Sequence, residues 1–296
     1  MIPSLLLLLV HLHSIAPASP PKNTDVMAEL RAMAGGEITI PNDIAKKAIQ
    51  VFQQVQEEFT TEKQQLSSST NPQTMQFWSA LQAIRRKENS GKFLRSMQTA
   101  GHSIQKYKDT NYGYGIVFYP GFQQLIRAIF AQRPSPLNIL VFGSNVGTEV
   151  LYLYHLFRKD VKSIVGIEIL ATLNKFAQDN AISNGFDQTV LHFHCYDALQ
   201  TDATLLQNSD LIWIDNQVWD LTLNIQIISM LQKASLKKNA IVVDFASAKN
   251  SHLHQTFLQE SLSSSLFREM NFREWRVPTS WAGNDPGAEV RVYQVL

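Results

Sequence analysis

The sequence predicts an α/β fold in which a mainly parallel sheet carries helices on both faces. Three observations lead to this prediction. Short apolar, β-branched runs alternate with helical patterns from residue 137 to residue 245, which is typical of strands that are covered on both faces. A turn that contains two glycines, Gly143 and Gly147, follows the first of these runs directly. Alternating runs at residues 269–277 and 289–295 indicate an antiparallel pair that closes the sheet.

Length and composition define the class of protein. The chain has 296 residues, which is enough for one large or two modest domains with a sizeable core. It carries 26 Lys and Arg against 25 Asp and Glu, so no overall field attracts nucleic acid or a membrane surface. The single cysteine, Cys195, excludes an internal disulfide and a multi-cysteine metal site. A globular protein of enzyme size is expected.

The N-terminal segment resembles a secretory signal over residues 1–18. The apolar run Leu5–Val10 precedes the small-residue stretch Ala16–Ala18, where cleavage is expected. This run is too short to span a bilayer as a stable helix. No Lys or Arg precedes it, so a disordered or mis-started N-terminus is the alternative. The proline-containing residues 19–41 are predicted to form a linker.

Residues 42–115 are predicted to form a helical lobe that precedes the sheet-containing domain, residues 116–296. An amphipathic helix is expected from residue 42 to residue 66, and a second one at about 76–87. Basic residues dominate the end of the second helix and the stretch that follows it. Those expected to contact a polyanion, unless they form an ordinary solvated surface, are Arg85, Arg86, Lys87, Lys92 and Arg95.

Polar side chains follow the predicted strands at the edge where open α/β sheets bind ligands. Glu168 could accept two hydrogen bonds from a ribose diol, and Asp197 could accept one from the exocyclic amine of an adenine. Asp215 and Asn216 follow the fourth strand, where they would face the reacting end of a bound ligand. A glycine turn and three acids in strand order therefore predict a nucleoside-binding crevice.

Two cofactor classes contain a nucleoside that could be held in this way. Nicotinamide dinucleotides usually require three glycines in the turn, and Asn145 stands where the second would be. S-Adenosylmethionine has no phosphate, so it permits more variation in the turn, and the closing antiparallel pair suits a methyltransferase. We therefore expect S-adenosylmethionine, with a nicotinamide cofactor as the alternative. No metal is expected, because strand alternation separates His192 and His194 from Cys195.

Several motifs in the same order resemble a known enzyme family, the disruptor-of-telomeric-silencing (DOT-one) type of histone-lysine methyltransferase, which lacks a SET domain. The resemblance extends from Tyr112 to Leu296, about two thirds of the chain. Its most specific pieces are Tyr114-Gly115 with the amphipathic stretch 122–129, Gly143-Ser144-Asn145-Val146-Gly147, Ile212-Trp213-Ile214-Asp215-Asn216 and Ser280-Trp281-Ala282-Gly283.

The resemblance implies a class I S-adenosylmethionine-dependent methyltransferase, with a Rossmann-like seven-stranded sheet, that transfers a methyl group to a lysine of a protein such as a histone in a nucleosome. It implies catalytic roles for Asp215, Asn216 and Trp219, with the indole as a wall of the lysine channel. The cofactor contacts that it implies, together with Asp215, are Tyr114, Gly143, Ser144, Asn145, Gly147, Thr148, Glu168 and Asp197.

Three departures from the family pattern concern the methionine end of the cofactor. Val141 replaces an acid that pairs with the cofactor ammonium, Ile116 replaces a glutamate, and Asn145 replaces a glycine. Each lost charged hydrogen bond is worth about 1.5–3 kcal/mol, and Asp215 is a candidate to compensate through an ion pair. A divergent enzyme and an inactive module that binds cofactor or partner are both consistent with the sequence. The family implies a nuclear or cytoplasmic location, whereas the signal-like start implies an extracytoplasmic one.

Overall fold

The computed structural model describes residues 42–88, 104, 117–216, 219–245, 266–270, 276–279 and 288–296. The predicted signal-like segment and linker, the boundary near residue 116, Tyr114 and the motif 280–283 lie outside the described residues. Within the described ranges, no helix combines the length and the apolar character that crossing a membrane requires.

The core of the molecule is a seven-stranded sheet with the strand order β3-β2-β1-β4-β5-β9-β6. The first five strands are parallel, whereas β9 is antiparallel to both β5 and β6. This confirms the predicted fold class. The strands are β1 (Asn138–Phe142), β2 (Ser163–Glu168), β3 (Leu191–Cys195), β4 (Leu211–Ile214), β5 (Ile241–Asp244), β6 (Phe267–Glu269) and β9 (Arg291–Val295).

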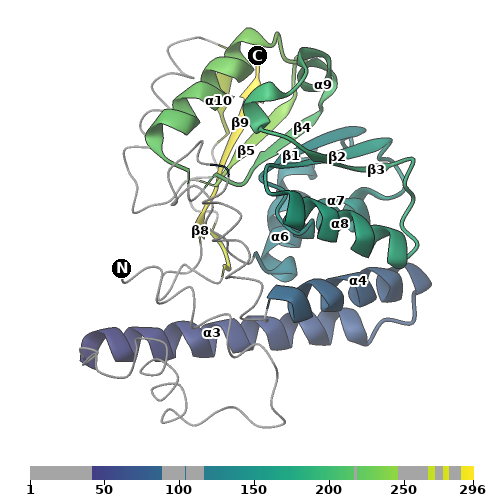
Figure 1. The fold of residues 1–296 in the computed structure, drawn as a ribbon, viewed down its shortest axis with the longest axis vertical. Coiled ribbons are helices and arrows are strands. Elements are labelled where there is room, and N and C mark those ends of the chain that lie inside the picture. Colours follow the sequence, from purple (N-terminus) through teal and green to yellow (C-terminus); the bar gives the residue numbers. More distant parts are fainter. Residues whose placement is uncertain are drawn as a thin grey trace.

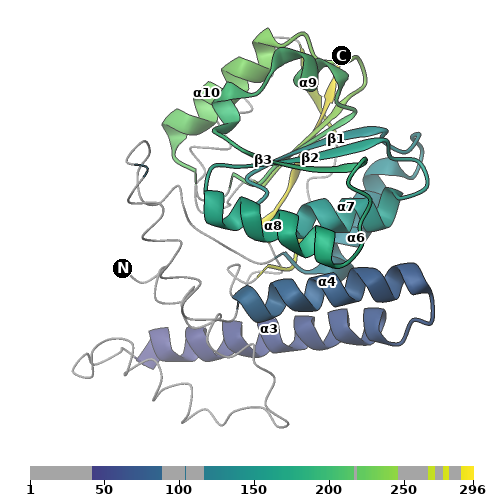
Figure 2. The ribbon, with the colours of Figure 1, turned by 45° about the vertical axis from the view of Figure 1, so that its right-hand side comes forward.

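Helices cover both faces of this sheet, as Figures 1 and 2 show. One face packs against α6, α7 and α8, and the other against α9 and α10. The helix bounds are α6 (Tyr119–Phe130), α7 (Thr148–Phe157), α8 (Ala171–Ser183), α9 (Ala203–Asn208) and α10 (Leu221–Lys233), and a short 3₁₀ helix, η2, spans Ala198–Gln200. Neither η2 nor α9 was predicted, because elements of three and six residues are too short for apolar residues to recur at helical spacing.

The two cores on the sheet's faces follow from the alternation of side chains along each strand. In β1, Ile139 and Val141 belong to the core beside α6 and α7, whereas Leu140 and Phe142 belong to the core beside α10. Successive side chains of a strand point to opposite faces. A fully apolar strand therefore packs against helices on both sides, which explains why these strands contain so few polar residues.

The helical lobe consists of α3 (Asn42–Ser67) and α4 (Pro72–Glu88), which lie beyond α6 and α7 in Figure 1. A buried ion network joins this lobe to the domain. Arg85 donates hydrogen bonds to Glu62 at 2.9 and 3.1 Å, to Glu88 at 2.9 Å and to the Tyr152 hydroxyl at 2.6 Å. Since Arg85 is only 7% exposed, the prediction that it contacts a polyanion is wrong: its charge is used inside the protein.

The C-terminal part of the sheet differs from the prediction. The run 269–277 was expected to form one strand that pairs with residues 289–295. Instead β6 ends at Glu269, while β7 (Arg276–Val277) pairs with β8 (Ala288–Glu289) in a separate two-stranded sheet. The apolar alternation marks β6 and β9 correctly. However, β9 pairs with both β5 and β6, so it is inserted between them and does not form a hairpin at the edge of the sheet.

Candidate functional site

The turn between β1 and α7 has the backbone geometry that its two glycines permit. Gly143 and Gly147 have φ angles of 70° and 87°, in a region that side chains rarely adopt. A Cβ atom on Gly143 would lie 3.1 Å from the Asp215 carbonyl oxygen, and one on Gly147 would lie 3.0 Å from the Ala177 Cβ. The turn therefore approaches the end of β4 closely, and α7 approaches α8.

Asn145, which replaces the middle glycine, connects this turn to the end of β4. Its φ angle is 50°, which asparagine tolerates better than most residues do. Its Nδ2 donates to the Gly143 carbonyl and to Asp215 Oδ2, both at 2.9 Å, and its backbone N–H donates to Glu168 Oε2 at 3.0 Å. One residue thus holds the turn, Glu168 and Asp215 together, as the sequence analysis expected of this edge.

Of the two carboxyl groups beside the turn, Glu168 is buried and Asp215 is partly buried, and neither forms an ion pair with a described residue. Glu168 also accepts a hydrogen bond from the Leu170 backbone N–H at 2.8 Å. Burial raises the pKa of Glu168 to about 7, although these backbone donors lower it in part. Burial, and then the Glu168 charge, raise the pKa of Asp215 to about 7. Such shifts are typical of functional sites, and their largest cause is the removal of both carboxyl groups from water.

The other predicted cofactor contacts lie farther from this center or are packed within the fold. Asp197 is buried at the end of β3, where it accepts a hydrogen bond from the Leu199 backbone N–H at 2.9 Å and caps η2. The Ser144 side chain lies against Gly166 of β2, where a Cβ would be 2.9 Å from its Oγ. Ser144 and Thr148 are buried, and their hydroxyl groups have no hydrogen-bond partner within the described ranges.

The predicted catalytic residues Asn216 and Trp219 follow β4 with Asp215. The Trp219 indole covers the turn, because its Cζ2 atom would lie 3.4 Å from a Cβ atom on Gly143. Asn216 donates to Asn224 Oδ1 at 2.7 Å and forms a side-chain hydrogen bond with Asp244. This arrangement places Trp219 against the turn, while Asn216 positions the start of α10.

One buried acid beside the turn was not predicted as a site residue from the sequence. Glu149 lies in the first turn of α7, is 2% exposed, and its Oε2 has no hydrogen-bond partner among the described residues. A signal was present: it is the only acid in the stretch Thr148–Phe157, which is otherwise almost entirely apolar. A charged residue two positions after the second glycine could have been selected on that basis.

Comparisons with known proteins give structural similarity alone. No protein-family model matches the sequence, and no curated protein matches it either. Solved structures that resemble it include a SAM-dependent methyltransferase from Aquifex aeolicus, at 10% identity and a TM-score of 0.44, covering 59% of this chain and 89% of that one. An O-methyltransferase from Bacillus cereus in complex with SAH has 13% identity and a TM-score of 0.44, with coverage of 70% and 91%. Cofactor-bound Rv0187 from MTB has 15% identity and a TM-score of 0.45, with coverage of 70% and 90%.

The strand order, and not these weak similarities, decides the fold. A seven-stranded sheet with five parallel strands, two antiparallel pairings at one side and helices on both faces agrees with the Rossmann-like seven-stranded sheet expected above, although the insertion of β9 was not expected. The fold is that of a class I S-adenosylmethionine-dependent methyltransferase. At these identities the similarity does not indicate an acceptor, and the histone-lysine family is not distinguished from others of the class.

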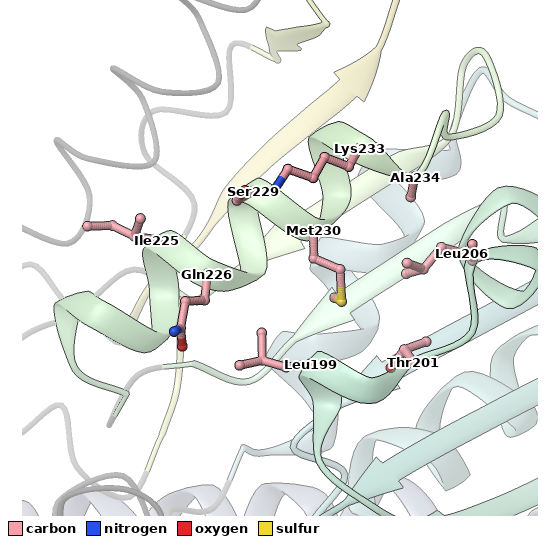
Figure 3. Close-up of a pocket in the computed structure, with 10 residues that line it drawn as sticks. Leu199, Thr201, Leu206, Ile225, Gln226, Ser229, Met230, Lys233 and Ala234 are labelled. Atoms are coloured by element: carbon pink, nitrogen blue, oxygen red, sulfur yellow. The ribbon is translucent and has the colours of Figure 1, made fainter.

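A separate groove of about 560 Å³ lies between α10 and the η2–α9 segment. Figure 3 shows Met230 pointing from α10 toward Leu199 and Leu206, whereas Ile225 points away from them. No predicted site residue lines this groove. The candidate site is therefore defined by the ends of β1, β2 and β4, and not by this groove.

Proposed function

We propose that this protein binds S-adenosylmethionine and transfers its methyl group to a lysine side chain of a protein. The observation that carries the proposal is the hydrogen-bonded group formed by the Gly143–Gly147 turn, Glu168 and Asp215 at the carboxyl ends of three parallel strands. In open α/β sheets this edge is the ligand-binding edge.

The residues present fit an adenosyl amino acid. Glu168 accepts backbone hydrogen bonds from Asn145 and Leu170 at different oxygens and a further one from Ile169. Because a carboxylate has about four acceptor positions, it can still accept from a ribose hydroxyl. The positive φ angles at Gly143 and Gly147 bend the turn tightly between β1 and α7. The first N–H groups of α7 begin directly after Gly147, and helix N-termini favour the carboxylate of an amino acid.

The methyl-transfer chemistry is supplied by the sulfonium of the cofactor when it is bound. The protein's own residues would orient and dehydrate the acceptor. A lysine amine, with a reference pKa of about 10.4, must lose a proton before it can react. Asp215, whose pKa burial raises to about 7, would accept a hydrogen bond from that amine. The Trp219 indole would exclude water and tolerate a neighbouring cation.

The proposal is tested by calorimetric titration with S-adenosylhomocysteine, followed by transfer of labelled methyl groups to lysine-containing proteins, with histone octamers as the first substrate. We expect binding of the wild-type protein, and about tenfold weaker binding for Glu168→Gln, which keeps the volume but loses the charged acceptor. Asp179→Asn, a change on the exposed side of α8, is the matched control. Absence of heat and of a thermal shift at millimolar ligand would overturn the proposal.

A second candidate function is an inactive module that binds cofactor or a partner. Val141 favours it, because this fully buried side chain occupies the place of the acid that pairs with the ammonium in the resembled family. Binding of S-adenosylhomocysteine without methyl transfer to any tested amine would favour this function. Its partner would contact the exposed Arg86 and Lys87, so that the double change Arg86→Glu and Lys87→Glu should abolish the interaction.

A further inference from the structure

Glu149 is a buried acid that has no role in the fold or the proposed function described so far. It is the second residue of α7, directly beside the Gly143–Gly147 turn, and it is 2% exposed. Its Oε2 accepts no hydrogen bond from any described residue. The carboxyl group does accept a hydrogen bond from its own backbone N–H, but a buried carboxylate with an unsatisfied oxygen is costly, and native proteins usually pair or solvate such a group. A buried acid at this position therefore indicates that a positively charged or hydrogen-bond-donating group binds beside it.

The described cation that affects Glu149, Arg85, already binds other groups. Arg85 acts electrostatically on Glu149, but its guanidinium donates to Glu62, Glu88, the Tyr152 hydroxyl and the Val117 carbonyl. Two carboxylates thus more than balance its single positive charge. No ion pair to Glu149 occurs in the described part of the chain.

The surroundings of Glu149 carry an excess of negative charge. Burial raises the pKa of Glu149 well above its usual range, and among its charged neighbours Asp215 adds most to this rise. Asp215 is in turn affected by Glu168. Three acids therefore influence one another around the turn, and a ligand that brings a positive charge would relieve all three.

We infer that Glu149 binds the α-ammonium group of the cofactor's methionine moiety, and so supplies the carboxylate that Val141 does not provide. This inference rests on the proposed function. The ammonium would lie between Glu149 and Asp215, at the side of the turn that Asn145 ties to β4. Relocating the acid from the end of β1 to the first turn of α7 keeps it beside the same turn, where the helix dipole also favours a carboxylate.

The test compares Glu149→Gln with the wild-type protein on three ligands by calorimetry. S-Adenosylhomocysteine has both the ammonium and the carboxylate, S-adenosyl-3-thiopropylamine has the ammonium alone, and 5′-methylthioadenosine has neither. We expect the variant to bind the first two roughly 10- to 100-fold more weakly. It should bind 5′-methylthioadenosine as the wild-type protein does. Asp179→Asn on the exposed side of α8 removes one carboxylate without this contact and should change nothing.

Two results would overturn the inference while leaving the proposed function intact. Equal weakening of all three ligands would assign Glu149 a general structural role, and no weakening of any would remove it from the site. If the wild-type protein binds none of the three, the proposed function fails and the inference fails with it. Should Glu149→Gln not fold, Glu149→Asp retains the charge one methylene shorter, and it should weaken the two ammonium ligands selectively.

Discussion

Two neighbouring groups of charged residues lie about one helical turn apart along α7, and they differ in how their charges are paired. Near Tyr152, Arg85 is held between Glu62 and Glu88, and Glu62 also accepts a hydrogen bond from the Tyr119 backbone N–H at 3.0 Å. Near Gly147, the described carboxyl groups of Glu149, Asp215 and Glu168 lie together without a cation. In the first group, here called the paired cluster (Arg85, Glu62, Glu88 and Tyr152), the charged groups bind one another. In the second group, the unpaired cluster (Glu149, Asp215 and Glu168), no described cation forms an ion pair with the carboxyl groups.

This difference separates a structural role from a binding role. The paired cluster joins α3, α4, α6 and α7, so that it fixes the helical lobe on the domain. Its hydrogen bonds need nothing from outside the protein. The unpaired cluster keeps acids buried at the cost of raised pKa values, which is the pattern expected where a site is organised for a ligand.

The largest effect is expected in the paired cluster, for Arg85→Met. This change leaves Glu62 and Glu88 buried without a cation, and breaking a buried pair in this way costs about 3–5 kcal/mol. Urea unfolding at pH 7.5 measures the loss in the free energy of unfolding. By contrast, Glu149→Gln in the unpaired cluster should leave the ligand-free stability unchanged or slightly higher, because it removes an unpaired charge.

The control for Arg85→Met neutralises the whole paired cluster. The triple change Arg85→Met, Glu62→Gln and Glu88→Gln removes the charges together and should recover part of the lost stability. If Arg85→Met were as stable as the wild-type protein, the ion network would contribute nothing, and the comparison between the two clusters would be wrong.

A smaller effect is expected from pH. The folded-state pKa values of Glu168, Asp215 and Asp244 are raised to about 7 by burial, above unfolded values near about 4. The folded protein therefore binds more protons between pH 4 and 7, and its stability falls as the pH rises through this window. His155, whose pKa burial lowers to about 4, acts in the opposite sense up to about pH 6.5. The net fall should be clearest between pH 6 and 7.

Unfolding by urea at pH 5.5, 6.5 and 7.5 measures this slope. Asp244→Asn removes one of the three acids, and it should flatten the fall by at most about 1.4 kcal/mol per pH unit. An Asp179→Asn control, which neutralises an exposed acid, should retain the wild-type slope. Stability that rises steadily from pH 5.5 to pH 7.5 would show that these carboxyl groups are not buried as described.

The smallest effect is expected at Asn145, the residue that connects the unpaired cluster to the turn. Asn145→Gly and Asn145→Ala both remove the hydrogen bond to Asp215, but alanine must also adopt the φ angle of 50°. The alanine variant should therefore be about 1 kcal/mol less stable than the glycine variant. Thermal unfolding of the two proteins side by side measures the difference, and equal stability would mean that the turn changes its backbone conformation.

The order of helices and strands was predictable from the sequence because the spacing of the apolar residues was clear and glycines marked the turns between the elements. The apolar strands, the Gly143–Gly147 turn and the helix that starts at Leu221 were all expected within a few residues. The partner of β6 was not predictable, because alternation identifies a strand but not its neighbour in the sheet. Alternation at residues 289–295 fits an edge strand and an inserted one equally well, and only the pairing with β5 decides between them.

The site was predictable where position along a strand fixes a residue's place, as for Glu168 and Asp215. It was not predictable where burial decides the role. Arg85 belonged to a basic run and was expected to contact a polyanion or solvent, yet Glu62 and Tyr152 from distant parts of the sequence bind it together with Glu88 of the same helix. Glu149 differs from Arg85 in this respect, because its isolation within an apolar helix was a local signal of burial that the sequence did contain.

The place of β9 bears on how this chain folds as it is synthesised. Strands β1 to β5 can pair as they appear, but β6 meets the sheet only through β9, whose last residue is Val295. Until the ribosome has released that segment, β5 presents an open edge that could pair with another chain. A chaperone that shields nascent strands would therefore be needed for longest at this edge, because β6 cannot join the sheet until β9 has paired with β5.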